Sequence, residues 1–519
     1  MKSDTIKQVV IVGGGTAGWL TAASLAKRFN SSAPDSIQIT IVESPDIPTI
    51  GVGEGTWPTM RKTLANLGIS ESEFLVKCNA SLKQATKFVN WQKTPKDGIE
   101  NHYYHLFTSF VDATEFNLAP YWQRKDVAKD KTFAESVSVQ GAICEANLAP
   151  KLITHKEYEG VQNYAYHLDA GLFADLLKEH ATQKLGVTHI SANVEKVNLD
   201  TDGYIASINT DRAGTIDGDF FVDCTGFKCL LLGDALGIGF KKVNNTLLTD
   251  HAIVMQVPYE TEQDEIASCT ISTAQEAGWT WDIGLSNRRG TGYVYSAKHT
   301  THERAEQVLR DYIGPQSEGL KARVIPMNIG YREKFWHKNC LAVGLSAAFI
   351  EPLEASAIFL MEAANNMLMD LFPRDRRAMA VVEEKFNTSF QFRWNKTIDF
   401  IKMHYVLSQR EEPFWQDNHA PETIPATLTK MLERWRHHPV SNYDFDNVYE
   451  PFPMESYQYV LYGMGFEQDL SFNSGRYSMV EQAQQTIDKV QAISDKVDQQ
   501  LPSNRELLNK IHQFGFQKL

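Results

Sequence analysis

The sequence predicts an α/β protein that opens with a Rossmann-like unit and closes with a mainly helical module. Three features of the 519-residue chain support this fold class. An apolar strand near the N-terminus runs into a glycine-rich loop and a helix, which is the order of a dinucleotide-binding unit. Two later apolar strands also end in glycine, and a helical pattern dominates after residue 372.

The order of the elements near the N-terminus predicts the dinucleotide-binding unit. A buried strand at Val9 to Val12 is followed by the glycine loop of residues 13–18, and a helix is expected from Gly18 to Phe29. A second strand, Ile37 to Val42, ends at Glu43. A lone glycine motif is weak evidence, because it can be an ordinary turn. Here every flanking element is present, so nucleotide binding is the favoured interpretation.

The residues of this loop suit a nucleotide. Gly13 permits a tight turn, Gly15 lets the backbone approach a pyrophosphate, and Gly18 lets the helix pack against the strand. The helix N-terminus supplies unpaired N–H groups and positive potential for the phosphates. Glu43 is placed to accept hydrogen bonds from ribose hydroxyls.

Later segments indicate how the chain is organised. Residues Ala170 to Leu185 predict an amphipathic helix with Asp169 as its N-cap. Two further strands end in glycine, one at Thr225-Gly226 and one at Gly344. Three such sites favour one large cofactor module over three separate domains. We expect a module of residues 1–372, with a substrate-facing insertion around 101–154, and a mainly helical substrate-pocket module of residues 373–519 packed on it as one unit.

The composition is that of an ordinary globular protein, with 43% hydrophobic and 22% charged residues. The 51 basic and 64 acidic residues give a net charge of −13, which argues against binding to nucleic acid or to a membrane. The six cysteines form no C-x-x-C pair and no histidine cluster accompanies them, so no metal site is expected. Few cysteines, no signal-peptide core and no bilayer-spanning stretch predict a cytoplasmic protein.

Several sequence blocks carry a resemblance to a known family. They occur in the order and at the spacing of that family, so together they are far more specific than any one block. On these blocks the chain resembles the flavin-dependent halogenases of the tryptophan-halogenase family. The blocks are IVGGGTAGW, SPDIPTIGVGEGTWP (Ser44 to Pro58), CNASLKQATKFVNW (Cys78 to Trp91), NYAYHLDA (Asn163 to Ala170), GWTWDIG (Gly278 to Gly284) and FIEPLEASAI (Phe349 to Ile358).

The resemblance implies FAD as the cofactor, supplied as FADH2 by diffusion from a separate flavin reductase. Reduced flavin, oxygen and a halide ion then give hypohalous acid, which travels through a tunnel to a small aromatic substrate. Glu54 lies in a loop that straps over the flavin in the family. The residues implied to bind FAD are Gly13, Gly15, Thr16, Ala17, Gly18, Glu43, Glu54, Val194, Gly344, Leu345 and Ile358.

Two residues are implied to be catalytic. Lys83 matches an essential lysine, whose ammonium can polarise hypohalous acid through a hydrogen bond or whose neutral amine can form a haloamine. The ordinary alternative is a solvated surface lysine. Glu354 matches an essential carboxylate that stabilises the cationic ring intermediate and removes its proton. The alternative is a glutamate in the first turn of a helix that starts at Pro352.

Four aromatic residues have implied roles around the flavin and the substrate. Trp279 and Trp281 crowd the flavin in the family, so that no organic substrate is hydroxylated directly. His105 and Phe107 match residues that line the aromatic substrate pocket. Taken alone, each of the four is more typical of a buried structural residue.

The halide site is implied to be the backbone amides of Ser356 and Ala357. These residues replace a threonine–glycine pair, and the added methyl group of Ala357 narrows the site, so bromide is expected ahead of chloride. Ala355 stands where the family often has a serine that orients the lysine. Gly284 replaces the proline of the tryptophan block, which loosens the backbone there.

The substrate is where the chain departs most from its family. Free-tryptophan halogenases hold the amino acid with a tyrosine pair and a glutamate, and no such pair occurs around Pro439 and Val440. Because a zwitterion without polar partners is costly to desolvate, free tryptophan is expected to be a poor substrate. Indole or another electron-rich aromatic fits better, and a peptide-borne tryptophan remains an alternative substrate. The sequence also leaves open whether the protein forms a homodimer.

Two rival functions remain at this level. A FAD-dependent aromatic hydroxylase (a monooxygenase) shares the cofactor fold but needs neither Lys83 nor the Trp279 and Trp281 block. A non-catalytic flavoprotein that binds a partner through its helical C-terminal part would tolerate the loss of both Lys83 and Glu354.

Overall fold

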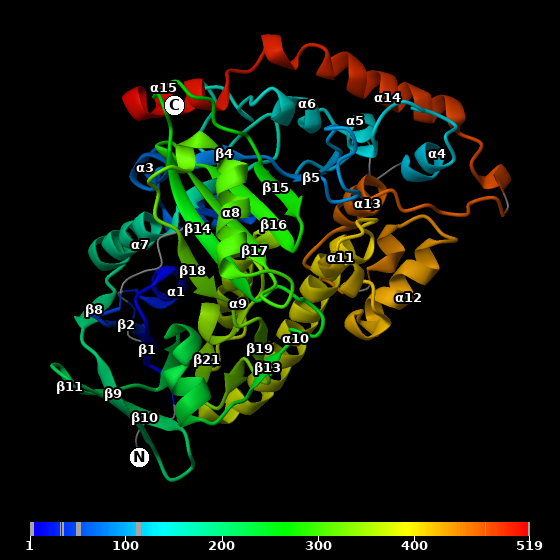
Figure 1. The fold of residues 1–519 in the computed structure, drawn as a ribbon. Helices are drawn as coiled ribbons and strands as arrows, with labels where there is room; N and C mark the ends of the chain where they lie inside the picture. The colour runs from blue at the N-terminus through cyan, green and yellow to red at the C-terminus, as the bar shows by residue number, and fades with distance from the viewer. Residues whose placement is uncertain are drawn as a thin grey trace. The chain divides into compact units, whose positions relative to one another are not determined.

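A computed structural model describes residues 5–31, 33, 36–47, 53–110, 116–445, 447–472 and 474–516. The chain divides into two compact units, each made of three segments (Figure 1). Unit 1 comprises residues 1–79, 168–243 and 328–394, and unit 2 comprises residues 80–167, 244–327 and 395–519. The units are interleaved along the chain, and residue 373 falls within the third segment of unit 1.

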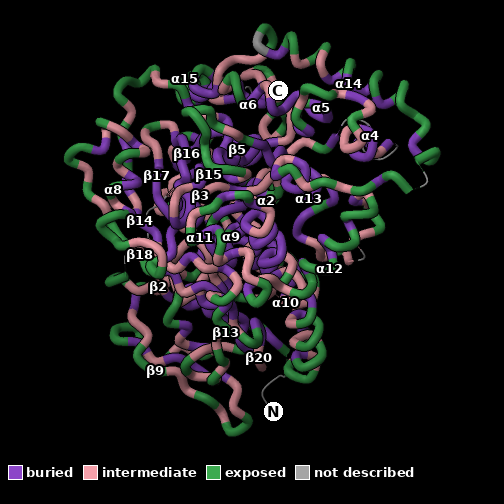
Figure 2. Tube along the Cα trace, turned by 45° about the vertical axis from the view of Figure 1, so that its right-hand side comes forward, coloured by how far each residue is buried: buried purple, intermediate pink, exposed green. Residues whose placement is uncertain are grey.

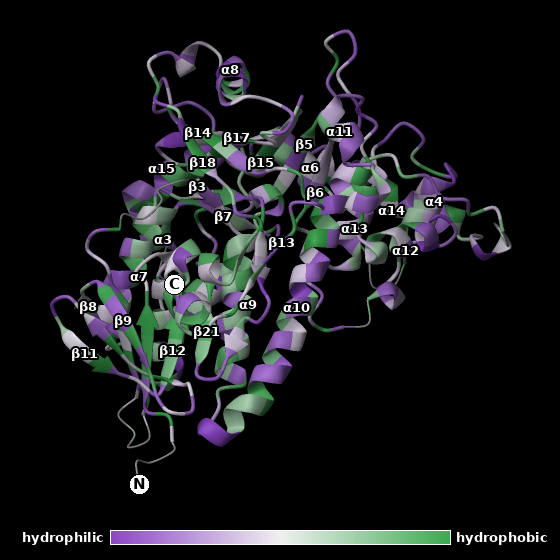
Figure 3. Cartoon of the chain, turned by 60° about the horizontal axis from the view of Figure 1, so that its bottom comes forward, coloured by the Kyte–Doolittle hydropathy of each residue, from purple (hydrophilic) through white to green (hydrophobic). Residues whose placement is uncertain are grey.

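The core of unit 1 is a mostly parallel sheet that contains the predicted N-terminal strands. Over the described residues it has six strands, in the order β20-β21-β12-β1-β2-β8. The central strand β1 pairs in parallel with both β2 and β12, and the apolar β12 is green in Figure 3. The strands are β1 (Gln8–Val12), β2 (Gln38–Glu43), β8 (Thr188–Ser191), β12 (Phe220–Asp223), β20 (Trp336–His337) and β21 (Cys340–Ala342).

Helices and small sheets complete unit 1. α1 (Thr16–Phe29) follows β1 and packs against α7 (Ala170–Lys184) and α9 (Ser356–Asp370). The side chain of Asp169 caps α7 as predicted, because it accepts hydrogen bonds from the backbone N–H of Gly171 at 3.0 Å and of Leu172 at 3.1 Å. The other elements are α2 (Thr59–Leu67), α3 (Glu71–Lys77), β3 (Gly53–Gly55), β9 (Val194–Leu199), β10 (Ile205–Thr210), β11 (Gly214–Asp217), β13 (Phe240–Lys242), β19 (Gly330–Arg332) and β22 (Ala348–Phe349).

A buried carboxylate at the end of β12 joins the second and third segments of unit 1. Asp223 is fully buried, and its Oδ1 accepts from the N–H and the hydroxyl of Thr225 and from the hydroxyl of Ser346. Its Oδ2 accepts from the N–H groups of Leu231 and Leu232 at 2.8 and 2.9 Å. Asp223 thereby holds together the two chain segments that the sequence analysis recognised as strand-then-glycine sites.

Unit 2 is built on a mainly antiparallel sheet. In the part of the chain that the structure describes, seven strands run in the order β18-β14-β17-β16-β15-β5-β6. Only the β15 and β5 pair is parallel among the pairings recorded in this sheet. The strands are β5 (Ala85–Val89), β6 (His102–Leu106), β14 (His251–Pro258), β15 (Thr270–Gln275), β16 (Gly278–Gly284), β17 (Arg288–Tyr295) and β18 (Arg323–Pro326).

Helices and one further short strand complete unit 2. α8 (His302–Ile313) lies across β14 and β17, where its apolar residues pack on Tyr293 and Tyr295 (Figure 1). A short strand β4 (Ser81–Lys83) pairs antiparallel with residues 165–167 of β7 (Ala165–Asp169). The remaining helices are α4 (Ala119–Gln123), α5 (Phe133–Val137), α6 (Gln140–Glu145), α11 (Pro413–Asp417), α12 (Ala426–Trp435), α13 (Met454–Gly463), α14 (Val480–Ser494) and α15 (Asn504–Phe514).

The α/β fold class and the helical C-terminal region are confirmed. α10 (Arg376–Val406) opens that region; its residues up to Trp394 belong to unit 1 and the rest to unit 2. The helix expected from Gly18 begins two residues earlier, at Thr16, because Gly15 is its N-cap. Among the described residues, every helix is too short or too polar to cross a bilayer.

Replacing Asp223 by Asn should lower the free energy of unfolding by roughly 3 kcal/mol, because an amide nitrogen would face backbone N–H donors that need an acceptor. Urea denaturation followed by tryptophan fluorescence measures this. The control is Asp217→Asn in β11, where the side chain is exposed. Equal stability of the two variants would contradict a structural role for the Asp223 carboxylate.

Candidate active site

The glycine loop of unit 1 has the geometry that a nucleotide requires. Gly13 has φ of +116°, and a Cβ on it would lie 2.1 Å from the carbonyl oxygen of Cys224. A Cβ on Gly18 would lie 1.9 Å from the carbonyl oxygen of Gly13. A Cβ on Gly15, by contrast, would have no atom within 4 Å of it, so the backbone there is open to a close ligand.

The start of α1 is free to hold phosphate. Its N-cap is Gly15, no side chain caps it, and its first turn, which includes Thr16 and Ala17, carries no acidic residue. The carboxylate of Glu43 lies beside Gly14, at the end of β2, and pairs with Lys178 at 2.7 Å. Open N–H groups next to a carboxylate fit the pyrophosphate and ribose of FAD.

Other predicted flavin residues lie around this loop. A Cβ on Gly344 would lie 2.6 Å from the Cβ of Ala17, so the 3-10 turn of Gly344 and Leu345 lies against the start of α1. Val194 begins β9, shortly after Ala192, whose N–H donates to the carbonyl of Glu43 at 3.0 Å. Ile358 is 1% exposed and lies on α9, a helix with many buried residues (Figure 2).

Within unit 1, the loop that is expected to cover the flavin contacts Glu354. This loop, here called the strap segment, contains Glu54 and Trp57. Trp57 follows β3, and its indole Nε1–H donates to the backbone carbonyl of Glu354 at 2.7 Å. Its ring stacks on Phe359 of α9, with centroids 4.1 Å apart. Burial, assisted by the charge of Asp169, raises the pKa of Glu54 to about 7. Residues 48–52 of the same block lie outside the described residues.

Glu354 does not lie in the first turn of an α-helix. Pro352–Glu354 form a 3-10 turn, Ala355 adopts a left-handed conformation with φ of +52°, and α9 begins only at Ser356. Pro352 therefore begins a short 3-10 helix that carries the buried Glu354. The α-helix with Ser356 and Ala357 is a separate element, which starts after the left-handed Ala355.

The N-terminus of α9 has features of an anion site. Its first turn contains no acidic residue, and no side chain caps it. The hydroxyl of Ser356 is buried and finds no hydrogen-bond partner among the described residues. Ala357 is exposed and helical, so its methyl group fits without backbone strain. A small anion such as a halide would satisfy these groups.

Lys83 is enclosed, unlike an ordinary surface lysine. It ends β4, is 1% exposed, and its Nζ lies 5.1 Å from the centre of the Phe107 ring. The N–H of Phe107 donates to the carbonyl of Gln84, which follows Lys83 directly. The structure thus brings together two residues that the resemblance assigned to the lysine and to the substrate pocket.

A buried histidine beside Lys83 was not recognised as a site residue from the sequence. His167 pairs with Ser81 across β4 and β7, and so lies on the same face as Lys83. Burial and then the charge of Lys83 hold the pKa of His167 well below its usual range. Its Nε2 lies 2.8 Å from the hydroxyl of Thr270. A histidine with so low a pKa is neutral and adds no positive charge beside Lys83.

His105 belongs to an aromatic cluster in unit 2. Its Nε2 lies 2.8 Å from the hydroxyl of Ser456, and its ring centroid lies 5.7 Å from that of Phe400. Phe400 in turn stacks on Phe452 at 3.7 Å. Ser456 lies near the start of α13. The cluster is a suitable lining for a flat aromatic molecule.

Trp279 and Trp281 lie on one face of β16 because they are two residues apart in a strand. Trp279 is 1% exposed and Trp281 is 9% exposed, and their ring centroids are 6.3 Å apart. A Cβ on the facing Gly292 would lie 2.1 Å from the ring of Trp281, so this glycine makes room for it. Two bulky rings are therefore held in place by the sheet itself.

Gly284 is less free than the sequence suggested. Its carbonyl accepts a short hydrogen bond from the hydroxyl of Ser81. The space that a Cβ would occupy is already filled, by Ile266 at 2.9 Å and by the hydroxyl of Tyr259 at 3.1 Å. The expected loosening of the backbone is therefore opposed by local packing.

Glu362 is a second group that the sequence did not single out. It is buried on α9 and accepts hydrogen bonds from the hydroxyls of Thr59, at 2.7 Å, and Thr63 of α2. Burial raises the pKa of Glu362 to about 7. The three residues tie α2, which follows the strap segment, to the helix that carries Ser356 and Ile358. No local sequence signal marks this contact, because the partners are far apart in the chain.

The sheet topology, the open glycine loop and the adjacent acid define a FAD-binding oxidoreductase. Comparison with known proteins narrows this class. Residues 8–473 match the sequence profile of the tryptophan halogenase family, and the chain belongs to that family. It is therefore a flavin-dependent halogenase, an enzyme that uses FADH2 and a halide and relies on a separate flavin reductase.

Three relatives show how far the similarity extends. A tryptophan halogenase from Shewanella frigidimarina NCIMB 400 has a crystal structure with a TM-score of 0.95 and 43% identity, over 99% of both chains. Tryptophan 7-halogenase RebH from Lentzea aerocolonigenes is 34% identical over 98% of this chain and 99% of its own length. Tryptophan 6-halogenase SttH from Streptomyces toxytricini is 35% identical over 88% and 89%.

Glu362→Gln should flatten the pH dependence of stability. Glu362 keeps its proton in the folded state up to about pH 7, whereas the ordinary value is 4.5. Between pH 4.5 and about pH 7 the folded state binds a proton that the unfolded state has lost. The stabilisation from this proton is therefore complete below pH 4.5 and is lost as the pH rises through about 7. Removing the group should reduce this fall by on the order of 3 kcal/mol.

Chemical denaturation between about pH 5 and pH 8 measures the effect. The matched control is Glu384→Gln on α10, where the side chain is exposed. The expectation would be contradicted if both variants kept the pH dependence of the unchanged protein.

Proposed function

We propose that this enzyme halogenates an electron-rich, indole-like aromatic substrate through hypohalous acid that is relayed to Lys83. The observation that carries the proposal is the enclosure of this lysine. Lys83 is 1% exposed, and its Nζ lies 5.1 Å from the Phe107 ring centre. An enclosed ammonium next to an aromatic face is suited to meet a small electrophile away from bulk water.

Unit 1 holds the cofactor and the halide in this proposal. FADH2 and oxygen supply the oxidising power that converts the halide into hypohalous acid. The residues of the glycine loop bind the pyrophosphate, and Glu43 binds the ribose. The amides of Ser356 and Ala357 bind the halide, which is supported by the uncapped start of α9 and by the buried hydroxyl of Ser356.

The chemistry on the substrate follows from two side chains. Hypohalous acid accepts a hydrogen bond from the ammonium of Lys83, which polarises the bond between halogen and oxygen. A ring carbon attacks the halogen, and the oxygen takes a proton from the Lys83 ammonium and leaves as water. The ring cation then loses its proton to a carboxylate, the role that we assign to Glu354. In balance, one carbon–hydrogen bond is replaced by a carbon–halogen bond.

Trp279 and Trp281 distinguish this proposal from a hydroxylase. We assign them the task of keeping organic substrates away from the flavin. Their burial on β16, and the space that Gly292 leaves for Trp281, support a fixed wall rather than a movable one. A hydroxylase would need the opposite, because its substrate must reach the flavin directly.

The substrate is proposed to be indole or a simple indole derivative rather than free tryptophan. The aromatic cluster around His105 suits a flat ring. Where the tyrosine clamp is expected, Val440 is fully buried and its carbonyl accepts from the side chain of Gln458 at 2.8 Å. That segment is occupied by internal contacts, which supports the absence of a clamp for a zwitterion.

Lys83→Ala should lower halogenation of indole about 100-fold or more, because the group that activates hypohalous acid is lost. FAD binding should be unchanged, since Lys83 belongs to unit 2 and the glycine loop to unit 1. The assay supplies FAD, a reductase, NADH, oxygen, bromide and indole, and detects the bromine isotope doublet by mass spectrometry. The control is Lys87→Ala on β5, where the lysine pairs with Glu145.

A product that persists in Lys83→Ala would overturn the proposed role of this lysine. A hydroxylated product formed without halide would instead support the aromatic hydroxylase. No turnover across a broad panel of aromatic compounds would oppose both enzymatic proposals.

In competition, kcat/KM should favour indole over free tryptophan at least tenfold, because the ammonium and carboxylate of tryptophan would be desolvated without partners. With bromide and chloride at equal concentrations, brominated product should dominate. Mass spectrometry of the product mixture measures both ratios. Preferred chlorination of free tryptophan would contradict the substrate and halide assignments while leaving the enzyme class intact.

A further inference from the structure

Lys83 sits where the chain passes from one sheet to another. It is the last residue of β4, which pairs with β7, and β5 begins two residues later in the seven-stranded sheet of unit 2. Within the described residues, β4 is also an edge strand, with β7 as its neighbour in the order β3-β7-β4. The direction of the Lys83 side chain therefore depends on how the peptide groups before and after it are held.

Both of these peptide groups are bonded to other parts of unit 2. The carbonyl of Leu82 accepts from the side-chain amide of Asn504 at 3.1 Å. The N–H of Gln84 donates to the carbonyl of Ser268 at 2.7 Å. One group from the C-terminal helix α15 and one from the segment before β15 thus fix the backbone on either side of Lys83.

Asn504 is itself held firmly. It is the first residue of α15 and is fully buried. Its backbone N–H donates to the carbonyl of Asn147 at 2.8 Å, and the preceding Ser503 forms a β-bridge with Leu148. Its side-chain nitrogen faces a second carbonyl, that of Ala267, at 3.5 Å. Because both neighbours are acceptors, the site requires a donor.

The backbone at Leu148, next to Asn147, also binds residues on the C-terminal side of Lys83. The carbonyl of Leu148 accepts from the side-chain amide of Gln84 at 2.8 Å and from the hydroxyl of Ser268 at 2.7 Å. Gln84, Ser268 and Asn504 are all fully buried. Lys83 is therefore flanked by a closed set of hydrogen bonds that includes the last helix of the chain.

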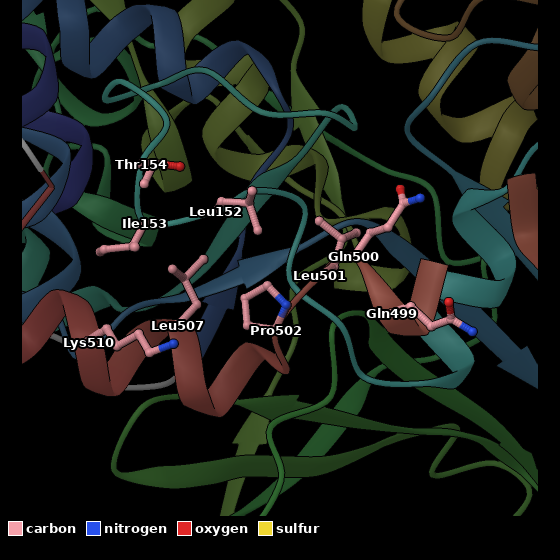
Figure 4. Close-up of a pocket in the computed structure, with 9 residues that line it drawn as sticks. All are labelled: Leu152, Ile153, Thr154, Gln499, Gln500, Leu501, Pro502, Leu507 and Lys510. Carbon is pink, nitrogen blue, oxygen red and sulfur yellow. The ribbon is translucent and has the colours of Figure 1, made fainter. Parts of the chain in front are cut away.

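Hydrophobic packing alone does not hold α15 in this place. A surface pocket of about 360 Å³ lies between residues 152–154 and the segment that leads into α15, with Leu507 and Lys510 of that helix on its wall (Figure 4). Leu507, Leu508 and Ile511 of α15 are buried, and Arg505 donates to the carbonyls of Asp264 and Ser286. The polar contacts of Asn504 and Arg505 therefore act together with apolar packing to fix the position of the helix.

We propose that Asn504 is a positioning residue that aims Lys83 at hypohalous acid. The inference rests on the proposed function of Lys83. Without the amide donor, the carbonyl of Leu82 loses this partner, so the peptide group between Leu82 and Lys83 is held less firmly, through the pairing of Lys83 with Ala165 of β7, and the ammonium shifts out of line. Displacements of about 1 Å in a reacting group cost on the order of 100-fold in rate.

The test is Asn504→Leu, which removes the donor without adding charge. Its matched control is Asn509→Leu, on the exposed side of the same helix. We expect kcat for bromination of indole to fall roughly tenfold to 100-fold, with the KM for indole and the affinity for FAD unchanged. Hypohalous acid released into solution, captured with a β-diketone trap in the absence of indole, should be formed at the normal rate.

This pattern distinguishes positioning from general damage. If Asn504→Leu lowered trapped hypohalous acid and indole bromination equally, or left both unchanged, the proposal would be overturned. Should the variant be insoluble, Asn504→Ala carries the same measurements. Lys83→Ala is run in parallel: if it still brominates indole, the proposed function of the lysine fails, whereas loss in Lys83→Ala with full activity in Asn504→Leu rejects the role of Asn504 alone.

Discussion

The enclosure of the Lys83 ammonium is the constraint on which the proposed chemistry depends. Burying a positive charge is unfavourable unless its surroundings compensate for it. Here the Phe107 ring provides a negative face near the ammonium, and His167 on the same strand face is kept neutral. A protonated His167 would place a further positive charge beside Lys83, and burial disfavours that state by lowering the pKa of His167.

In the proposed function, unit 1 has a different task, which is to hold a flavin and a halide without filling their places with side chains. Glycines and bare helix N-termini do this, because they offer N–H groups and open space. The cost is weak local packing, and buried polar contacts offset it. Asp223 joins the second and third segments of unit 1, and Glu362 ties α2 to α9. Trp57 extends the same connection to the carbonyl of Glu354.

Much of this arrangement could be predicted from the sequence. The glycine loop, Glu43 and the Asp169 cap depend on residues close together in the chain, and each was found where expected. The family blocks pointed to Lys83 and Phe107 as parts of one site, and the two side chains do meet. Pro352 begins a 3-10 helix, but a left-handed Ala355 divides it from α9, and nothing in the alanine side chain signals that conformation.

By itself, the sequence determined the order of elements, the cofactor class and the family, because periodicity and motif order are carried by neighbouring residues. Only the tertiary structure decided which distant groups support them. Asn504 reaches Leu82 across more than 400 positions of sequence, and Thr59 reaches Glu362 across about 300. Such contacts are set by how strands and helices pack, and packing partners that lie far apart leave no pattern in the local sequence.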